Sequence, residues 1–465
     1  MSAAVRRSFA SLEIPNYRLY FGGQVISLAG NWMQIVAELW LVLALTGSGA
    51  LVGLATALQF AGILLFGALG GALADRFDKR RLLMISQTGM AIPALLLFAL
   101  TATGAVAAWM VFVVIALRGL VLAVDNPARQ AFVIELVGPD RVVNAVSLNS
   151  VLVHSARITG PAVAGAVIAL WGVAPCFGLN ALSFAAMLVA LARMRPDRLH
   201  RPKRERRRDG VRRALGHIAA RRELRVPLLL MLVLSTIGFN FQVVIPLLAG
   251  QTFGGQVSAY SLLMVAMGLG SIAGALGVGT RARVGRELIT AAAGGFGLTS
   301  LLAAAAPTLE LEMAALALLG VCSVTFAAGI NSGLQLAAEP EMRGRVMAVY
   351  SIAFLGSTVI GGPIAGWLGE AISPRAPLVA AGIAGLAVAA AAFSAWSERD
   401  SGTAPHPSGE LALEPGTGEL ALAAAQAPER SRAGPMSSAR RSSRSRAPCQ
   451  SRTLGSPSSR QPRSR

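Results

Sequence analysis

Long apolar stretches recur along this chain up to about residue 396, and short polar connections separate them. A helix needs about 20 predominantly apolar residues to cross a bilayer, and the stretches reach that length. A soluble chain would instead show polar residues at every third or fourth position of its helices. We therefore predict an all-α membrane protein with twelve transmembrane helices, over residues 18–45, 49–74, 82–103, 107–126, 142–170, 173–194, 226–249, 257–280, 287–306, 311–336, 346–370 and 376–396.

The predicted helices form two groups of six that show an internal repeat. Helices 142–170 and 346–370 share a charged start and a later Gly-Pro step followed by another glycine. Proline removes a helical hydrogen bond and glycine tolerates a bend, so we expect helix breaks there. Repeats of this kind place a site at the bilayer midplane between two halves. The expected break residues are Gly160, Pro161 and Gly165 in the first half and Gly362, Pro363 and Gly366 in the second.

Polar composition marks two further segments, which divide the chain into four parts. Residues 195–225 carry thirteen Arg or Lys against four acids and are expected to form a basic cytoplasmic loop. Residues 401–465 are rich in Ser, Arg, Pro and Ala and bury too little apolar surface to fold, so we expect a disordered basic tail. The predicted parts are a six-helix half over 1–194, the loop 195–225, a second half over 226–400 and the tail 401–465.

The distribution of charge indicates how the protein is oriented in the membrane. The chain is 54% hydrophobic and 14% charged, with a formal net charge of +19, but most of the excess lies in the loop and the tail. A dispersed basic surface for nucleic acid is therefore not indicated. Basic connections follow every second helix, and positive loops stay in the cytoplasm. We expect a multi-pass protein of the inner (cytoplasmic) membrane with both termini in the cytoplasm.

The connection between the second and third helices carries the most specific motif. It reads Gly71-Ala-Leu-Ala-Asp75-Arg76-Phe-Asp78-Lys-Arg80-Arg. Gly71 permits close helix approach, and a carboxylate at Asp75 can face the positive N-terminus of a neighbouring helix. The motif resembles the signature loop of the major facilitator superfamily, although Asp78 stands where that pattern has glycine. The resemblance implies two pseudo-symmetric six-helix halves, a helix-11 partner for Asp75, and a cytoplasmic gate formed with Gly71, Arg76 and Arg80.

The resemblance extends over residues 15 to 396. It includes Asn16-Tyr17-Arg18, Pro127-Ala-Arg129-Gln and Arg343-Gly-Arg345-Val-Met-Ala. Together these are similar to the exporter branch that contains the enterobactin exporter and drug efflux proteins. The Gly-Pro step in helix 142–170 also resembles a motif of the superfamily's antiporters. A packing kink explains that step equally well.

Four ionisable residues inside the spans are candidates for transport and proton coupling. Burying a charge in the bilayer costs several kcal/mol or more, so such residues face a wet cavity or a partner. Glu38 lies in the outer half of the first helix, and we expect it to carry the coupled proton. Arg118 and Arg157 could each hold a substrate carboxylate or neutralise an acid such as Glu38. His154 is a polar residue with a titration range suited to proton transfer.

Polar side chains of the second half could line the opposite wall of a central cavity, although most such groups form interhelical hydrogen bonds. They are Asn240, Gln242, Asn331 and Gln335.

The sequence predicts a secondary active transporter, with a proton-coupled exporter of a siderophore, drug or secondary metabolite as the favoured function. No phosphate-binding glycine loop, metal-ligand cluster or nucleophile arrangement is visible, so we expect no ATPase, no enzyme, no metal and no cofactor. The expected partners are a small-molecule substrate, a proton or other ion gradient and the lipid bilayer, for a monomer that binds no nucleic acid. An importer of a metabolite or lysolipid and a non-transporting receptor or scaffold are the alternatives.

Overall fold

The structure is a computed structural model that describes residues 10–138, 141–200, 211–279, 281, 285–339 and 342–400. Within the described helices, a few side chains, His154 among them, fall outside the description. The predicted tail 401–465 lies outside the described residues as well. All the described helices belong to one compact unit that ends at Gly402.

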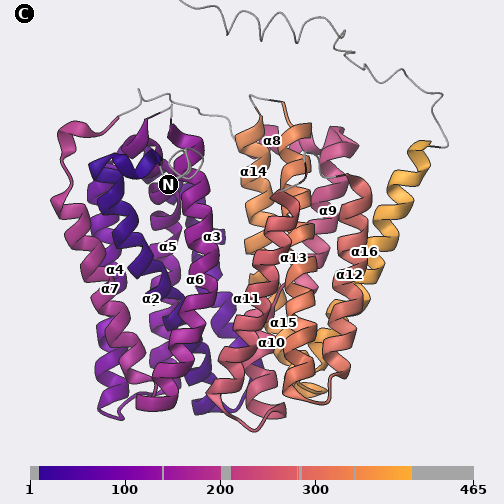
Figure 1. Cartoon of the computed structure of the whole chain (residues 1–465), viewed down its shortest axis with the longest axis horizontal. Coiled ribbons are helices and arrows are strands. Elements are labelled where there is room, and N and C mark those ends of the chain that lie inside the picture. The colour runs from indigo at the N-terminus through magenta and orange to yellow at the C-terminus, as the bar shows by residue number, and fades with distance from the viewer. Residues whose placement is uncertain are drawn as a thin grey trace, which may run out of the picture. The chain divides into compact units, whose positions relative to one another are not determined.

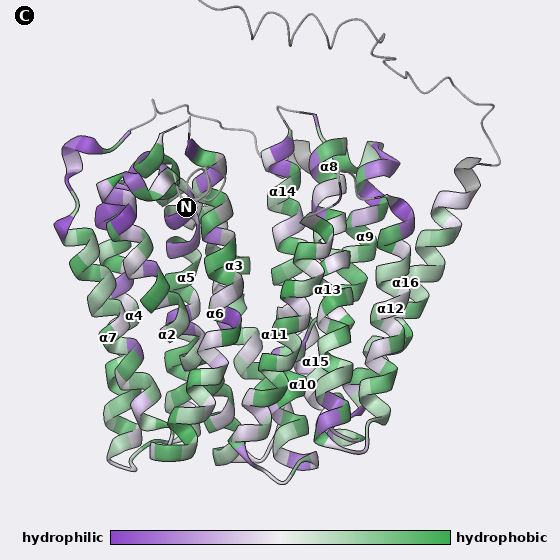
Figure 2. Cartoon of the chain, in the orientation of Figure 1, coloured by the Kyte–Doolittle hydropathy of each residue, from purple (hydrophilic) through white to green (hydrophobic). Residues whose placement is uncertain are grey.

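The described residues contain twelve helices long and apolar enough to span a membrane, as the hydrophobic pattern predicts. Apolar residues cover their length, and hydrophilic residues gather mainly at the end that carries α8 and α14 (Figure 2). The elements of the first half are η1 (Ala10–Glu13), α2 (Pro15–Thr46), α3 (Gly49–Arg76), α4 (Lys79–Ala102), α5 (Ala108–Val137), α6 (Val142–Trp171) and α7 (Ala174–Arg193).

The second half follows the connection that contains η3 (Pro196–Arg198) and α8 (Val211–Ala220). Its elements are α9 (Arg222–Ile237), α10 (Phe241–Leu247), the π-helical turn η4 (Leu248–Thr252), α11 (Val257–Gly279), α12 (Arg286–Ala305), α13 (Leu309–Ala337), α14 (Arg343–Ser351), the π-helical turn η5 (Ile352–Gly356), α15 (Thr358–Ala371) and α16 (Ala376–Asp400). In this half α9, α10 and η4 form one span, and α14, η5 and α15 form another.

Polar caps and glycines set the ends of several helices. Ser48 begins α3 by accepting a hydrogen bond from the Leu51 amide at 3.3 Å, and Thr308 accepts one from Leu311 at 3.4 Å at the start of α13. These side chains satisfy amides that have no partner within the helix. Gly47 ends α2 in the left-handed region, at φ 64°, which glycine adopts at little cost.

Two sequence expectations about elements are wrong in detail. The helix expected to stop at residue 126 continues as α5 to Val137, through Pro127. The expected breaks at Gly160–Pro161 and Gly362–Pro363 are absent, because α6 and α15 remain helical through both prolines. The seventh span is instead interrupted between Ile237 and Phe241, and the eleventh contains the π-helical turn η5. The expected basic loop also includes a short helix, α8, which leaves its role as the connection between the halves a prediction.

The two halves pack against each other mainly through two helix pairs, α3 with α15 and α6 with α11, and α10 adds smaller contacts with α2 and α3 (Figure 1). We call the end where α2 begins and α3 ends the basic end, and the opposite end the distal end. The closest approach is between α3 and α15 near the distal end. A β-carbon on Gly53 would overlap the carbonyl group of Gly362, and one on Gly366 would overlap that of Gly49. This glycine seam brings two backbones into direct contact, as small residues do in membrane helix pairs.

Contacts between the halves extend from the distal end to about mid-membrane. Trp40 stacks on Tyr260 with ring centroids 6.0 Å apart, and Gly165 packs against Ser261. The deepest glycine contacts are those of Gly356 with Leu64 and of Gly268 with Ile158, both near the middle of their spans. Three hydrogen bonds join described residues of the two halves at the distal end: Ser48 and Ala50 donate to Glu370, and Gln251 donates to the Gly47 carbonyl. The halves are therefore closed at the distal end and apart at the basic end (Figure 1).

Candidate functional site

A buried ion pair joins α2 to α5 in the first half. The Arg118 Nη1 atom of α5 contacts Glu38 Oε2 of α2, and each residue is 1% exposed. The Gln34 side-chain amide, one helical turn before Glu38, donates to Glu38 Oε1 at 2.7 Å. Glu38 and Arg118, two of the residues singled out from sequence, are thus brought together. The guanidinium compensates the buried carboxylate, which would otherwise be very costly in this environment.

The ion pair continues into a polar chain that reaches α7. Asn180 donates to the Gln34 side-chain oxygen, and Ser183 Oγ donates to Asn180 Oδ1 at 2.8 Å. Gly30 faces this pair, and a β-carbon there would overlap Asn180 Oδ1. The chain therefore links three helices of one half without crossing to the other. Sequence reasoning missed the three polar residues, although amides within apolar spans were a usable signal.

Arg157 of α6 occupies a different environment from Arg118. Its guanidinium lies over the Trp32 ring at 5.2 Å from the centroid, in cation–π geometry. Gly160, three residues along α6, allows the same tryptophan to approach closely. Arg157 Nε is buried without a hydrogen-bond partner, and no described carboxylate forms an ion pair with this arginine. Arg157 therefore presents a positive charge that the described residues leave uncompensated. The side chain of His154 lies outside the described residues.

The polar residues expected to line the second half occupy three separate places. Asn240 lies at the interruption between α9 and α10, where its amide donates to the Thr236 carbonyl at 2.8 Å. Gln335 donates to Asn331 at 2.5 Å along α13. Gln242 has a buried side-chain oxygen with no partner among the described residues. No hydrogen bond between described residues connects this set to Glu38, Arg118 or Arg157.

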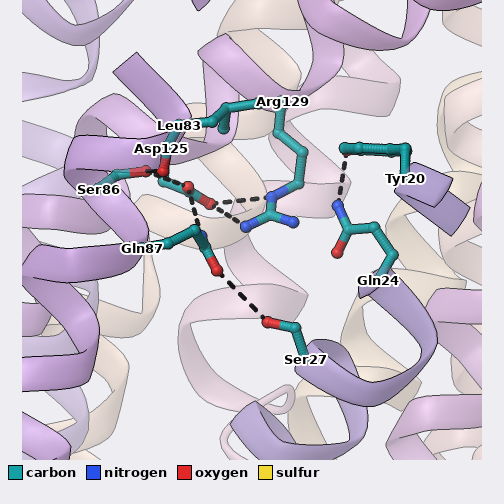
Figure 3. Close-up of polar contacts among 8 residues, drawn as sticks. All are labelled: Tyr20, Gln24, Ser27, Leu83, Ser86, Gln87, Asp125 and Arg129. Atoms are coloured by element: carbon teal, nitrogen blue, oxygen red, sulfur yellow. Dashed lines mark hydrogen bonds and ion pairs between the residues drawn. The ribbon is translucent and has the colours of Figure 1, made fainter. Parts of the chain in front are cut away.

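A second polar cluster ties α2, α4 and α5 together nearer the basic end (Figure 3). Asp125 Oδ2 accepts from Arg129 Nε at 2.9 Å and from Nη2 at 2.6 Å. Asp125 Oδ1 accepts from Ser86 at 2.6 Å and from Gln87 at 3.0 Å. The Arg129 guanidinium lies between Asp125 and the hydrogen-bonded pair of Tyr20 and Gln24 (Figure 3). Because α5 extends to Val137, Asp125 lies inside the helix and not near its end, where the predicted helix 107–126 would have placed it.

The signature loop takes several structural roles. Asp78, which departs from the family pattern, caps α4 by accepting a hydrogen bond from the Arg81 amide at 3.0 Å. Arg80 donates to the carbonyls of Leu191 and Ala192 at the end of α7, at 2.6 and 2.9 Å. Lys79 forms an ion pair with Glu135 at 2.7 Å. The loop thereby fastens the basic ends of α4, α5 and α7 to one another.

The expected helix contacts of Gly71 and Asp75 differ from what the structure shows. A β-carbon on Gly71 would have no neighbour within 4 Å, whereas one on Gly70 would overlap the Ala123 carbonyl of α5. Gly70 is therefore the residue that permits close approach, and the expectation for Gly71 is wrong. Asp75 and Arg76 are exposed at the end of α3, and no hydrogen bond joins Asp75 to a described residue.

The arrangement of two six-helix halves around this site agrees with comparisons to known proteins. The model of the transmembrane secretion effector family matches residues 6–417. The chain belongs to this family of major facilitator transporters. This membership agrees with the resemblance that the signature loop shows.

Relatives in the family are transporters of several kinds. The staphyloferrin A transporter of Staphylococcus aureus is 26% identical over 258 residues, which are 55% of this chain and 64% of that protein. Macrolide efflux protein A of Streptococcus pyogenes is 23% identical over 72% of this chain and 85% of its own length. Multidrug efflux pump Tap of Mycobacterium tuberculosis is 26% identical over 77% and 87%. The chain thus spans less than two thirds of the first of these relatives.

Solved structures agree on the fold. A bacterial homologue of the human lysosomal transporter Spinster, in an inward-facing and occupied conformation, superposes with a TM-score of 0.67 at 14% identity, over 82% of this chain and 97% of that one. A nucleoside transporter superposes with a TM-score of 0.62 at 15% identity, over 83% and 98%. At these identities the likeness establishes the major facilitator fold and not the substrate.

Proposed function

We propose that this protein exports small organic molecules from the cytoplasm by alternating access, driven by the proton gradient. The basic end is the cytoplasmic end in this proposal, and both termini lie in the cytoplasm of a cell with the protein in its inner membrane. The placement of Arg76, Lys79, Arg80 and Arg81 at one end supports this orientation, since positive connections stay in the cytoplasm.

The observation that carries the proposal is the one-sided contact between the halves. The glycine seam and the Trp40–Tyr260 stack close the distal end, while the contacts stop near mid-membrane at Leu64 and Ile158. In this proposal a substrate reaches the midplane from the basic end, where the halves are apart (Figure 1). Opening the seam while the basic ends close would expose the same site to the other side.

The favoured substrate is an organic anion with an apolar or aromatic part. Arg157 supplies a positive charge that no described carboxylate neutralises, and Trp32 supplies a flat apolar face beside it. Arg118 is a weaker candidate for binding the substrate, because Glu38 already compensates its charge. A siderophore of the carboxylate type fits this pair, and a staphyloferrin A transporter is among the relatives.

Proton coupling is assigned to the Glu38–Arg118 pair. A proton and the Arg118 guanidinium compete for the same carboxylate, so protonation of Glu38 would release Arg118 and break the link between α2 and α5. Gln34 and Asn180 extend that link to α7, so the change would reach three helices. Coupling through this pair would make helix packing in the first half depend on proton binding.

The direction of transport is tested with inverted and right-side-out membrane vesicles. Inverted vesicles energised with a proton gradient should accumulate a labelled carboxylate siderophore, and a protonophore should stop the accumulation. Accumulation in right-side-out vesicles alone would indicate an importer. Binding without accumulation in either kind would indicate a receptor or scaffold.

A further inference from the structure

Glu312 of α13 is a buried acid that the proposed transport mechanism does not use. It lies in the first turn of α13, at the distal end, and is 0% exposed. Both of its carboxyl oxygens are buried without a hydrogen-bond partner among the described residues. Leu309 and Leu316, one turn before and one turn after it, pack in or against the hydrophobic core. The carboxyl is therefore enclosed without the donors that normally stabilise a buried carboxylate.

Arg375, the residue just before α16, is close enough to Glu312 to interact with it electrostatically. The two residues nevertheless form no hydrogen bond. The Arg375 guanidinium donates instead to two backbone carbonyls at the end of α12, those of Ala304, at 3.1 Å, and of Ala306. An arginine beside an ionised carboxylate would normally bind it through a charge-assisted hydrogen bond. A neutral Glu312 explains why Arg375 binds the carbonyls and not the acid.

Burial determines the protonation state of Glu312. An ionised carboxylate without hydrogen-bond donors is very costly in an apolar interior, and such a group takes up a proton instead. The positive end of α13 favours the ionised form, but this contribution is small beside the loss of water. The carboxyl is nevertheless near the distal surface, because Thr308, Glu310 and Leu311 beside it are exposed. A proton therefore has a short path between Glu312 and the distal side.

The charged residues on the neighbouring helices lie far from Glu312. The helices packed against α13 are α9, α11, α12 and α14. Tyr260 of α11 and Tyr350 of α14 stay neutral below about pH 9. At the distal end of the second half, the described charged residues besides Glu312 are exposed Glu310, exposed Glu370 and Arg375. The described charged residues of the four helices all lie at the basic end, and they are Arg222, Glu223, Arg225, Arg286, Glu287, Arg343 and Arg345.

We propose that Glu312 is a proton-binding site of the second half, which holds a proton from the distal side in this conformation and takes Arg375 as its counter-ion when the proton leaves. The proton passes to water on the distal side, and Arg375 moves from the α12 carbonyls to the carboxylate that remains. Arg375 and Glu370 flank the short connection between α15 and α16, and Glu370 binds α3 of the other half. Proton binding at Glu312 is thus linked to the segment that joins the halves at the distal end. The site is separate from the Glu38–Arg118 pair, and it does not depend on the direction of transport.

The test records infrared spectra of the purified, reconstituted full chain, in which a neutral carboxyl group absorbs apart from a carboxylate. Between pH 6 and pH 9 the unchanged protein should lose a neutral-carboxyl band, whereas exposed acids are already ionised at pH 6. Glu312→Gln should lack that band at every pH. Glu310→Gln, which removes the exposed acid two residues away, should keep it. Glu38→Gln should keep it as well, because Glu38 is paired with Arg118.

Two variants of Arg375 test its role as the counter-ion. Arg375→Gln removes the charge that stabilises the carboxylate, so the midpoint at which the band disappears should rise by about one pH unit or more. Arg375→Lys keeps the charge and should leave the midpoint close to that of the unchanged protein.

The melting temperature in detergent gives a second measurement, which needs no assignment of a band. Unfolding exposes Glu312 to water, where it ionises, so the unchanged protein should lose stability as the pH rises from 5 to 8. Glu312→Gln cannot ionise, so its melting temperature should fall less over the same range. Glu310→Gln should follow the unchanged protein.

The inference is overturned if the unchanged protein loses no neutral-carboxyl band between pH 6 and pH 9, or if the band survives in Glu312→Gln. A band that disappears in Glu38→Gln would place the proton on the first half and also overturn it. An unchanged midpoint in Arg375→Gln, or equal pH dependence of melting in Glu312→Gln and the unchanged protein, would do the same. Failure of the unchanged protein to accumulate substrate in vesicles contradicts the proposed function alone, because the spectra do not depend on transport.

Discussion

At the scale of single residues, the site depends on which buried arginine forms an ion pair with Glu38. Glu38 and two arginines could be recognised from sequence as intramembrane charges, but the sequence left open which arginine Glu38 would bind. The answer depends on how α5 and α6 are rotated against α2, which no local pattern determines. The structure pairs Glu38 with Arg118 and leaves Arg157 over Trp32. The amides of Gln34 and Asn180, which complete the network, were detectable only as polar residues in apolar spans.

We predict that Glu38→Gln destabilises the protein as well as uncoupling it. Without the carboxylate, buried Arg118 keeps an uncompensated charge, which costs about 3–5 kcal/mol in comparable sites. The double variant Glu38→Gln/Arg118→Gln removes both charges and should recover most of the melting temperature in detergent. It should still lack pH-driven export in proteoliposomes. Recovery of both stability and pH-driven export would show that the pair is only structural.

We predict that Arg157→Gln discriminates between substrates by charge. It should weaken binding of an anionic substrate about tenfold, the value of one hydrogen bond to a charged group, and leave a neutral substrate of similar size unaffected. Arg157→Lys keeps the charge and should retain part of the affinity for the anion. The measurement is equilibrium binding in detergent. An equal loss of affinity for both substrates would show that Arg157 packs against Trp32 and does not recognise the anion.

At the scale of elements, hydrophobic length was enough to predict all twelve spans, because each must satisfy its own backbone within the bilayer. The ends were less predictable. The predicted helix stopped at residue 126, yet α5 continues through Pro127 to Val137, with Asp125 bound to Arg129 across that turn. The glycines near Pro363 suggested a break, but they serve the seam with α3. Where a helix ends or bends therefore depends on contacts with residues far away in the sequence, which the local pattern does not show.

We predict that Gly53→Leu prevents closure of the distal end. Its side chain would overlap the backbone of Gly362, and overpacking of this kind costs about 1–3 kcal/mol, so export should fall roughly tenfold. Gly71→Leu is the matched control on the same helix, since Gly71 has no neighbour within 4 Å. Vesicle accumulation at equal expression measures both. Equal effects of the two substitutions would contradict a role for the seam.

We predict that Asp78 stabilises α4 as its cap. Asp78→Ala removes the acceptor for the Arg81 amide and should lower the free energy of unfolding by about 1 kcal/mol. Asp78→Gly restores the residue of the family pattern. It should lower the free energy of unfolding by only a few tenths of a kcal/mol, because glycine is itself tolerated at the N-cap position. The measurement compares the melting temperatures of the two variants with that of the unchanged protein. A larger loss for glycine than for alanine would rule out the capping role.

At the scale of the whole molecule, the division into two halves could be predicted from the repeat and the basic segment. The end at which the halves close could not, because the same sequence must support both closed states. The structure adds that information: the seam of Gly49, Gly53, Gly362 and Gly366 is engaged, and the contacts stop at mid-membrane. The central claim is that the protein alternates between two states: the halves are in contact at the distal end in one state and at the basic end in the other.

Paired distance measurements test that claim most directly. One pair of spin labels, at Thr103 and Gln256, reports on the distal end, and a second pair, at exposed Arg193 and Leu336, reports on the basic end. When substrate or acid shifts the reconstituted protein between states, the distal distance should lengthen as the basic distance shortens. Two distances that stay fixed, or that change in the same direction, would contradict alternating access in this protein.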